Sequence, residues 1–195
     1  LWTWRLWQHW QAQLDEYPPA RAAQAMFDDL IVPVHEMRET GLLLDQARHR
    51  DLVAVWERKR DVFEGNIRAL VSEDEVANLQ SRKQWSDYFA AILPDEYLAA
   101  WPRTEKTGQL EIKTSTCREM ASKAGGEGPL AEVLFNIADL TTVNQYLSNF
   151  GNKLINMAQQ ARDGRLHPSY NIARAVTGRF SSSSPNAQQF PRDRE

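Results

Sequence analysis

The chain has 195 residues, of which 42% are hydrophobic and 25% charged, enough for one or two globular domains with a core. Its single cysteine, Cys117, excludes an intramolecular disulfide and favours a reducing compartment. No apolar run approaches the roughly 20 residues of a membrane helix, so we expect no membrane partner.

The charge is unevenly distributed along the chain. The formal total is −3, but residues 161–195 hold six Arg against three acids, a balance of +3 that leaves −6 for residues 1–160. A locally basic end can seat a polyanion, although the same clustering also occurs on an ordinary solvated surface.

Both ends of the chain have the character of cut points. The first residue is Leu1 rather than Met, no signal peptide is visible, and the last residues, 191–195, are charged without a helix stop. We therefore expect a fragment, or one product of a processed or split gene.

Helical periodicity begins at once. Trp7, Trp10 and Leu14 share one face of a first helix over residues 1–15, at spacings of three and four. A Trp face of this kind is far more often a packing surface than a ligand site. Without its packing partner it would be exposed.

Two longer helices are predicted next. The second covers residues 19–40, with a kink at Pro33 and a stop at Gly41. The third runs from an Asp45 N-cap to about residue 71, about 40 Å at 1.5 Å per residue. A helix of that length needs a partner, and the second helix is the candidate for antiparallel packing.

Capping patterns place two shorter helices in the middle of the chain. Ser81 and Gln84 fit a capping box that opens a helix over residues 82–92. Thr116 and Glu119 fit a second box, which opens a helix to about residue 123. The polar segment between the two helices is predicted to be a loop.

The pattern changes near the carboxyl end. A last long helix is expected over residues 129–162, with Gly151 as a weak point. Residues 165–172 and 175–181 are rich in β-branched and aromatic residues and predict two short strands. The Ser, Asn, Gln and Pro residues of 181–191 predict an extended loop.

The enzyme patterns that can be tested in this chain are incomplete. His35 and Glu36 begin like a zinc helix, but Glu39 stands where a second His would be needed. The Ser-rich run 181–184 lacks the strand and helix of a nucleophile elbow. The glycine-rich run 125–128 lacks the strand of a phosphate loop, so we predict neither a metal site nor a catalytic residue here.

The carboxyl-terminal motifs carry a resemblance to a known family. The runs GRLHPSYN (164–171), TGRFSS (177–182) and PNAQQFPRD (185–193) follow one another in that order. Together they closely resemble the palm-edge signature of family A (DNA polymerase I-like) DNA polymerases. Upstream, VPVHEMRETGLLLD (32–45), NLQSRKQWSDYF (78–89) and IKTSTCREMA (112–121) resemble the family's thumb in the same order.

The resemblance implies both domains and fold. Residues 1–27 would end an exonuclease-like domain, 28–160 would form the thumb, and 161–195 would begin the palm. The fold class implied is mainly α with a small β element: long antiparallel thumb helices followed by a short antiparallel β strip at the palm edge.

It also implies DNA-binding residues. A polymerase must hold any sequence, so phosphate and minor-groove contacts should dominate. Arg179 would donate into the minor groove, and amide side chains would line the template and primer backbone, namely those of Asn186, Gln188 and Gln189. Phosphate contacts from the thumb are implied for Lys83 and Lys153, and for backbone amides at the Ser81 cap.

Several positions depart from the family pattern. Ala187 stands where Leu is usual, Ser184 where Asn or Asp is common, and Phe190 where Ile is usual. Expected lysines of the last long helix are Thr or Val at 141–143. The FGNKL and QQFPRD variants resemble a phage-like branch.

The implied parent is a DNA-directed DNA polymerase, a nucleotidyltransferase of DNA replication or repair in the cytoplasm of a bacterial or phage-infected cell. Its partners would be primer–template duplex and deoxynucleotides, with Mg²⁺ held by carboxylates beyond Glu195. This chain would bind no metal and be inactive alone. Two alternatives stay open: a non-catalytic DNA-binding subunit that needs a second polymerase chain, and a helical protein-interaction scaffold.

Overall fold

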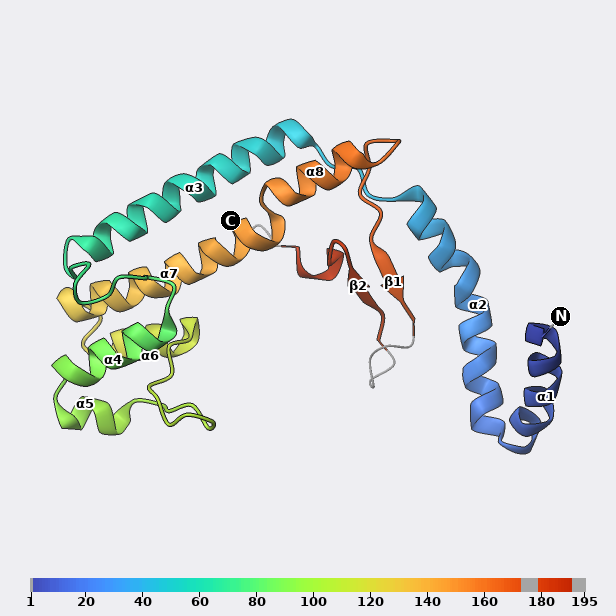
Figure 1. The fold of residues 1–195 in the computed structure, drawn as a ribbon, viewed down its shortest axis with the longest axis horizontal. Helices are drawn as coiled ribbons and strands as arrows, with labels where there is room; N and C mark the ends of the chain where they lie inside the picture. The colour runs from blue at the N-terminus through green and yellow to red at the C-terminus, as the bar shows by residue number, and fades with distance from the viewer. Residues whose placement is uncertain (1, 173–178, 191–195) are drawn as a thin grey trace. The chain divides into compact units, whose positions relative to one another are not determined.

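The computed structural model describes residues 2–172 and 179–190 (Figure 1). It divides into two compact units: a helical unit, Asp45–Lys153, and a discontinuous unit that joins Leu1–Leu44 to Leu154–Glu195. The family domains expected from the sequence have other boundaries, near residues 27 and 160. That assignment remains a prediction.

The helical unit is built on an antiparallel helix pair. Its elements are α3 (Gln46–Arg68), α4 (Arg82–Ile92), α5 (Asp95–Ala100), α6 (Thr114–Lys123) and α7 (Pro129–Phe150). His49 Nε2, at the start of α3, lies 2.7 Å from the Phe150 carbonyl oxygen at the end of α7. Asn66 Nδ2, near the end of α3, donates to Asn136 Oδ1 at 3.0 Å. These contacts make α3 and α7 antiparallel, as Figure 1 shows.

The choice of α2 as the partner of α3 was therefore wrong. The apolar repeat of α3 indicates which face is buried, but it does not say which of two apolar helices covers that face. The partner is α7, whose buried residues include Val133, Ile137 and Leu140. Helix α6 also packs on α7.

Local chemistry fixes most helix ends in this unit. The Asp45 carboxylate accepts from the Arg48 N–H at 3.0 Å, as predicted for an N-cap. Ser81 Oγ accepts from the Gln84 N–H at 3.3 Å. The second capping box is wrong: α6 begins at Thr114, and the Thr116 hydroxyl donates to Glu111 Oε2 at 2.7 Å. The short helix α5 lies in the segment predicted to be a loop.

An aromatic stack forms the centre of the hydrophobic core. Trp85 stacks on Phe89 with ring centroids 5.6 Å apart, and Phe89 lies 5.2 Å from Trp101. Trp85 is only 1% exposed, and its indole N–H donates to the Leu79 carbonyl at 2.9 Å. The buried indole N–H therefore has a hydrogen-bond acceptor. The continuous cluster of buried side chains around the stack lies entirely within residues 67–140.

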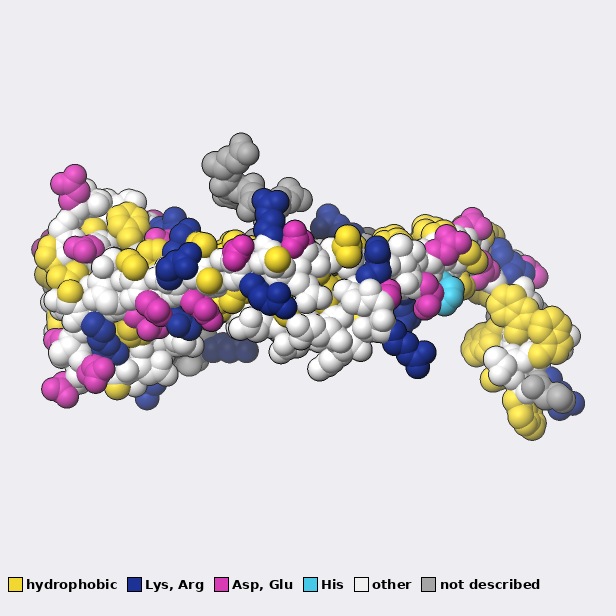
Figure 2. Space-filling model, turned by 90° about the horizontal axis from the view of Figure 1, so that it is seen from above, with side chains coloured by type: hydrophobic (Ala, Val, Ile, Leu, Met, Phe, Trp, Pro, Cys, Tyr) yellow, Lys and Arg dark blue, Asp and Glu magenta, His cyan; other side chains and the backbone are white. Residues whose placement is uncertain are grey.

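The discontinuous unit begins with two helices that bury little. Helix α1 (Trp2–Glu16) packs on α2 (Pro18–Thr40), and the Arg21 guanidinium bonds to Asp15 and Gln11. Trp2 is 76% exposed and Trp10 52%. Figure 2 shows hydrophobic side chains gathered at this end of the chain. The Trp face is therefore exposed in this chain, and its packing partner stays a prediction.

The carboxyl-terminal part of this unit contains the small sheet. It begins inside helix α8 (Asn152–Gln160). Strand β1 (Ser169–Asn171) then pairs antiparallel with β2 (Ser181–Ser183), with Tyr170 opposite Ser182. A 3-10 turn, η1 (Ala187–Gln189), follows. The fold class is mainly α with a small antiparallel β element, as predicted.

The strand boundaries differ from the prediction. The first strand is shorter than 165–172, and the second begins at Ser181, the last residue of the predicted second strand, and continues into the predicted loop. Serine has no strong strand propensity, so pairing with β1 rather than local sequence defines β2. Residues 175–178 of the predicted second strand lie outside the described residues.

Among the described residues, no helix is both long and apolar enough to cross a bilayer.

Candidate nucleic-acid interface

The strip formed by β1, β2 and η1 is organised by one buried hydroxyl. Ser182 Oγ donates to Asn186 Oδ1 at 3.0 Å and accepts from the Gln188 N–H at 3.3 Å. Asn186 Oδ1 also accepts from the Gln188 N–H at 3.3 Å, which makes Asn186 the cap of η1. Ser182 is buried, so these bonds form away from bulk water. They fix the course of the chain from β2 into η1.

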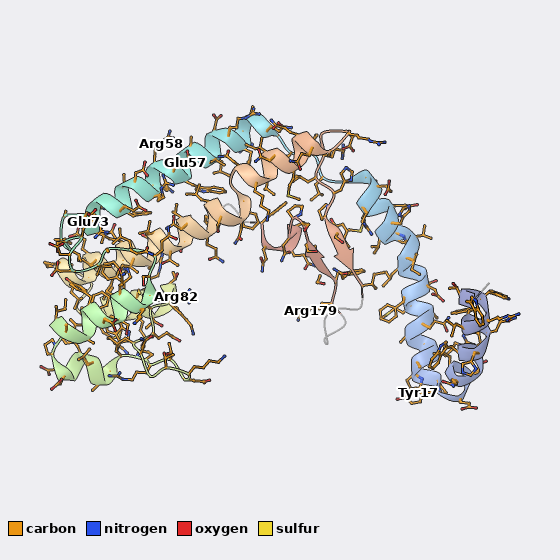
Figure 3. The ribbon with its side chains drawn as sticks, in the orientation of Figure 1. Tyr17, Glu57, Arg58, Glu73, Arg82 and Arg179 are labelled. Atoms are coloured by element: carbon orange, nitrogen blue, oxygen red, sulfur yellow. The ribbon has the colours of Figure 1, made fainter. Side chains whose placement is uncertain are left out.

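Arg179 and the amides of η1 lie on the surface of this strip. The Arg179 side chain is exposed just before β2 and makes no hydrogen bond or ion pair to any described residue (Figure 3). Gln188 and Gln189 are exposed, and the Gln188 amide donates to the Phe180 carbonyl at 3.0 Å. Arg174, Arg192 and Arg194, the other arginines of this end apart from Arg162 and Arg165, lie outside the described part of the chain.

The predicted amide side chains therefore differ in the groups that remain free to bind a ligand. The Asn186 oxygen is occupied by the Ser182 hydroxyl and the Gln188 N–H, so its NH₂ group is the part that remains to donate. Gln189 is exposed, and its side-chain amide makes no hydrogen bond to a described residue. A surface that combines a guanidinium with amides can meet both phosphate oxygens and base acceptors.

The helical unit has a second candidate surface at the start of α4. Gln84 does not complete the reciprocal capping box: its Oε1 accepts from the Asn78 N–H at 2.8 Å, while its N–H is capped by Ser81. The backbone N–H groups of Arg82 and Lys83 belong to the first helical turn, which has no intrahelical acceptors for them. Together with two cationic side chains, such a helix start favours an anion.

A pocket of about 150 Å³ opens beside this helix start. Its polar lining comes from Gln80, Arg82, Thr141 and Asn144, and its apolar lining includes Trp85. Arg82 is exposed and labelled in Figure 3. Sequence reasoning selected Lys83 and missed Arg82. The sequence did indicate Arg82, because this residue directly follows the Ser81 cap and is therefore close to the free backbone amides.

The position of Lys153 depends on the end of helix α7 at Gly151. A Cβ on Gly151 would lie 2.4 Å from the Leu147 carbonyl oxygen, so only glycine fits where α7 ends. His49 Nε2 contacts the carbonyl oxygens of Phe150 and Gly151, at 2.7 and 3.2 Å. Lys153 follows two residues later and is exposed.

The exposed face of α3 has a different character. Figure 2 shows basic and acidic side chains interspersed along it, and Arg60 pairs with Asp61 at 2.9 Å. The electrostatic potentials of opposite charges at this spacing cancel at distances beyond a Debye length. The five arginines of α3 therefore do not form a positive field.

Among the described residues, neither the single thiol nor a metal cluster offers a reactive centre. Burial raises the pKa of the Cys117 thiol to about 12, so no thiolate forms near neutral pH. Within residues 2–172 and 179–190, no three His, Cys, Asp or Glu side chains gather closely enough to hold a metal ion. What the described residues present at the predicted positions is a set of exposed cationic and amide side chains.

Comparison with known proteins identifies the family. The model of DNA polymerase family A matches residues 46–195, and the chain belongs to that family. It is 31% identical over 156 residues to the thermostable DNA polymerase I of Thermus filiformis, covering 80% of this chain and 17% of that protein. It is 28% identical over 193 residues to DNA polymerase I of Chloroflexus aurantiacus, covering 98% and 19%.

Two further relatives extend this result. The DNA polymerase of Bacillus phage SP01 is 44% identical over 68 residues, 35% of this chain and 7% of that protein. Among solved structures, the POL domain of Pol1 from M. smegmatis, in complex with DNA primer-template and dNTP, matches with 28% identity and a TM-score of 0.51, covering 83% of this chain and 26% of that one. The chain thus spans less than a fifth of the length of these curated relatives.

Proposed function

We propose that these 195 residues hold primer–template duplex for a DNA-directed DNA polymerase of family A. The proposal rests on Arg179, which is exposed and makes no hydrogen bond or ion pair to a described residue, in a strip whose course is fixed by Ser182. The chain is also similar to a polymerase domain in complex with DNA primer-template and dNTP. Arg179 donates into the minor groove, where acceptors are similar for all base pairs. Asn186, Gln188 and Gln189 contact the strand backbones.

The helical unit contributes phosphate contacts as the thumb. Ser81 orders the start of α4, where the free amides, Lys83 and Arg82 face solvent, and Lys153 adds a charge after the Gly151 break. These contacts are independent of base identity, which suits an enzyme that must copy any sequence.

Nucleotidyl transfer belongs to the whole protein. The family's reaction uses divalent metal, Mg²⁺ in this proposal, with deoxynucleotides as substrates. Within the described part of the chain, no three His, Cys, Asp or Glu side chains gather to hold such an ion. The bacterial and phage relatives support a role in replication or repair in the cytoplasm, and the phage relative supports a phage-like branch.

The test is salt-dependent binding of the 195-residue chain to duplex DNA, measured by fluorescence anisotropy. Loss of the Arg82 phosphate contact in Arg82→Ala should reduce the slope of log affinity against log salt by about one. Arg179→Ala should weaken binding about tenfold, the worth of one charged hydrogen bond of about 1.5 kcal/mol.

The matched control is Arg58→Ala. Arg58 is an exposed arginine of α3 that makes no hydrogen bond or ion pair to a described residue, and its loss removes the same charge (Figure 3). It should leave both affinity and slope nearly unchanged. If Arg58→Ala weakened DNA binding as much as Arg179→Ala, binding would depend on net charge alone, and this result would contradict the proposal.

A further inference from the structure

A short segment of the discontinuous unit joins two parts of the chain that are far apart in sequence. Leu42 and Leu166 exchange both backbone bonds, with N···O distances of 2.7 and 2.9 Å. The Arg165 guanidinium reaches the Gly41 carbonyl at 3.4 Å. His167 lies at the centre of this junction, and strand β1 begins two residues after it.

His167 bridges two oxygen atoms. Its Nδ1 lies 2.6 Å from the Arg38 carbonyl oxygen at the end of α2, and its Nε2 lies 3.0 Å from Asp163 Oδ1. A carbonyl oxygen and an ionised carboxylate can only accept hydrogen bonds. A neutral imidazole has one N–H and can satisfy only one of them. Both bonds form together only when the ring carries two protons.

The surroundings are shaped to hold the ring in this place. Gly41 has φ of +62°, and a Cβ there would lie 2.8 Å from both His167 Cε1 and the Leu166 oxygen. Asp163 Oδ1 also accepts from the Arg165 N–H at 3.1 Å, so the carboxylate is held toward His167. The charged groups around the ring are Arg38 and Glu39 at the end of α2, and Arg162, Asp163 and Arg165.

We propose that doubly protonated His167 is a pH-sensitive clasp that fastens the segment leading into β1 to the end of α2, and that the clasp opens when the imidazole loses a proton. An open pocket of about 570 Å³, lined by Arg38, Asp163 and His167 among others, gives water access to the ring. The clasp is independent of whether the chain binds DNA.

Two titrations bound the pH range of the clasp. The hydrogen bond to Asp163, and to a lesser extent the bond to Arg38, raises the pKa of His167. The stabilisation that protonated His167 gives the folded state is therefore complete below about pH 6.5 and is lost as the pH rises through the higher folded pKa. The bond from His167, followed by that from the Arg165 backbone, lowers the pKa of Asp163. The stabilisation that ionised Asp163 gives the folded state is therefore present above about pH 3.9 and is lost as the pH falls through the lower folded pKa.

The protonation state can be read directly on the 195-residue chain. Long-range ¹H–¹⁵N correlation spectra of the histidine rings should show both His167 nitrogens protonated at about pH 6.5, where a free histidine is half neutral. A single neutral tautomer of His167 at about pH 6 would overturn the proposal.

Opening of the clasp is measured by amide hydrogen exchange of Leu42 and Leu166, corrected for the intrinsic rate. Between about pH 6 and about pH 9, their protection should fall tenfold for each unit by which the folded pKa of His167 exceeds the free value. Asp163→Asn should shift this fall to lower pH, and His167→Gln should abolish it.

The matched control is His35→Gln, which removes an exposed histidine of α2 that makes no hydrogen bond to a described residue. It should leave the fall unchanged. If His167→Gln does not fold, the wild-type spectra and Asp163→Asn decide the question. Protection that does not change with pH, or that is the same in Asp163→Asn as in the wild type, would contradict the clasp.

Discussion

The two units of this chain are stabilised in different ways. In the helical unit a continuous core of buried side chains lies within residues 67–140 and centres on Trp85, Phe89 and Trp101. The discontinuous unit has few buried apolar side chains, among them Val34 and Leu166, and depends on hydrogen bonds such as those of Ser182 and His167. Burial stabilises the first unit, and local polar geometry gives the second its shape.

This difference separates stability from binding. Exposed residues such as Arg179 and Gln189 contribute little to a core, so their loss should affect DNA binding with little effect on folding. Substitution in the aromatic stack should do the reverse. We therefore expect that folding and DNA binding can be perturbed separately.

The largest effect is expected from Trp85→Ala. It removes the ring that stacks on Phe89 and the hydrogen bond to the Leu79 carbonyl, which should cost the helical unit about 3–5 kcal/mol of unfolding free energy. Urea denaturation measures this loss. The control is Leu43→Ala, at a side chain that is 77% exposed, with an expected change within about 0.5 kcal/mol. A small loss for Trp85→Ala would contradict the account of the core.

A glycine pair within the helical unit should give effects of opposite sign. Gly151→Ala places a Cβ 2.4 Å from the Leu147 carbonyl, and we expect a loss of about 1–3 kcal/mol. Gly65→Ala, inside α3, meets no atom within 4 Å and should gain about 0.5–1 kcal/mol. Thermal unfolding of the two variants compares them directly. A loss in Gly65→Ala would show that α3 has a neighbour on that side.

The smallest effect is predicted at Ser184, in the turn after β2. Its φ of 53° lies in the left-handed region, which glycine adopts without strain and asparagine adopts more readily than serine. The same backbone conformation would suit the Asn or Asp that the family resemblance implies at this position. Ser184→Gly should stabilise the turn by up to about 1 kcal/mol, measured by hydrogen exchange of the Gln188 amide. Reduced protection would contradict this reason for the family preference.

Local chemistry made much of the fold predictable. Asp45, Ser81, Pro129 and Gly41 mark helix ends because each acts through its own backbone or its nearest neighbours. The pairing of α3 with α7 was not predictable, because an apolar face does not specify its partner.

Two local predictions failed for the same physical reason. Thr116 was assigned to a cap, but its hydroxyl bonds to Glu111 instead. Strand β2 consists of three serines and exists through pairing with β1. In both cases a specific contact overrides a local preference.

The candidate site was only partly predictable. The family motifs point to Arg179 and the η1 amides, but the hydrogen bonds that occupy the Asn186 oxygen arise from the turn geometry. The position of Arg82 after the Ser81 cap was visible in the sequence, but the pocket beside it was not, because its lining includes Thr141 and Asn144, which are distant in sequence.

The most direct test of the central claim compares the affinity of the 195-residue chain for two primer–template duplexes of unrelated sequence, each over a range of salt concentrations. Holding through phosphates and shared minor-groove acceptors predicts equal affinities and equally steep salt dependence. A difference of tenfold or more between the duplexes, the effect of a single base-specific contact of about 1.4 kcal/mol, would contradict it, as would the absence of binding at low salt.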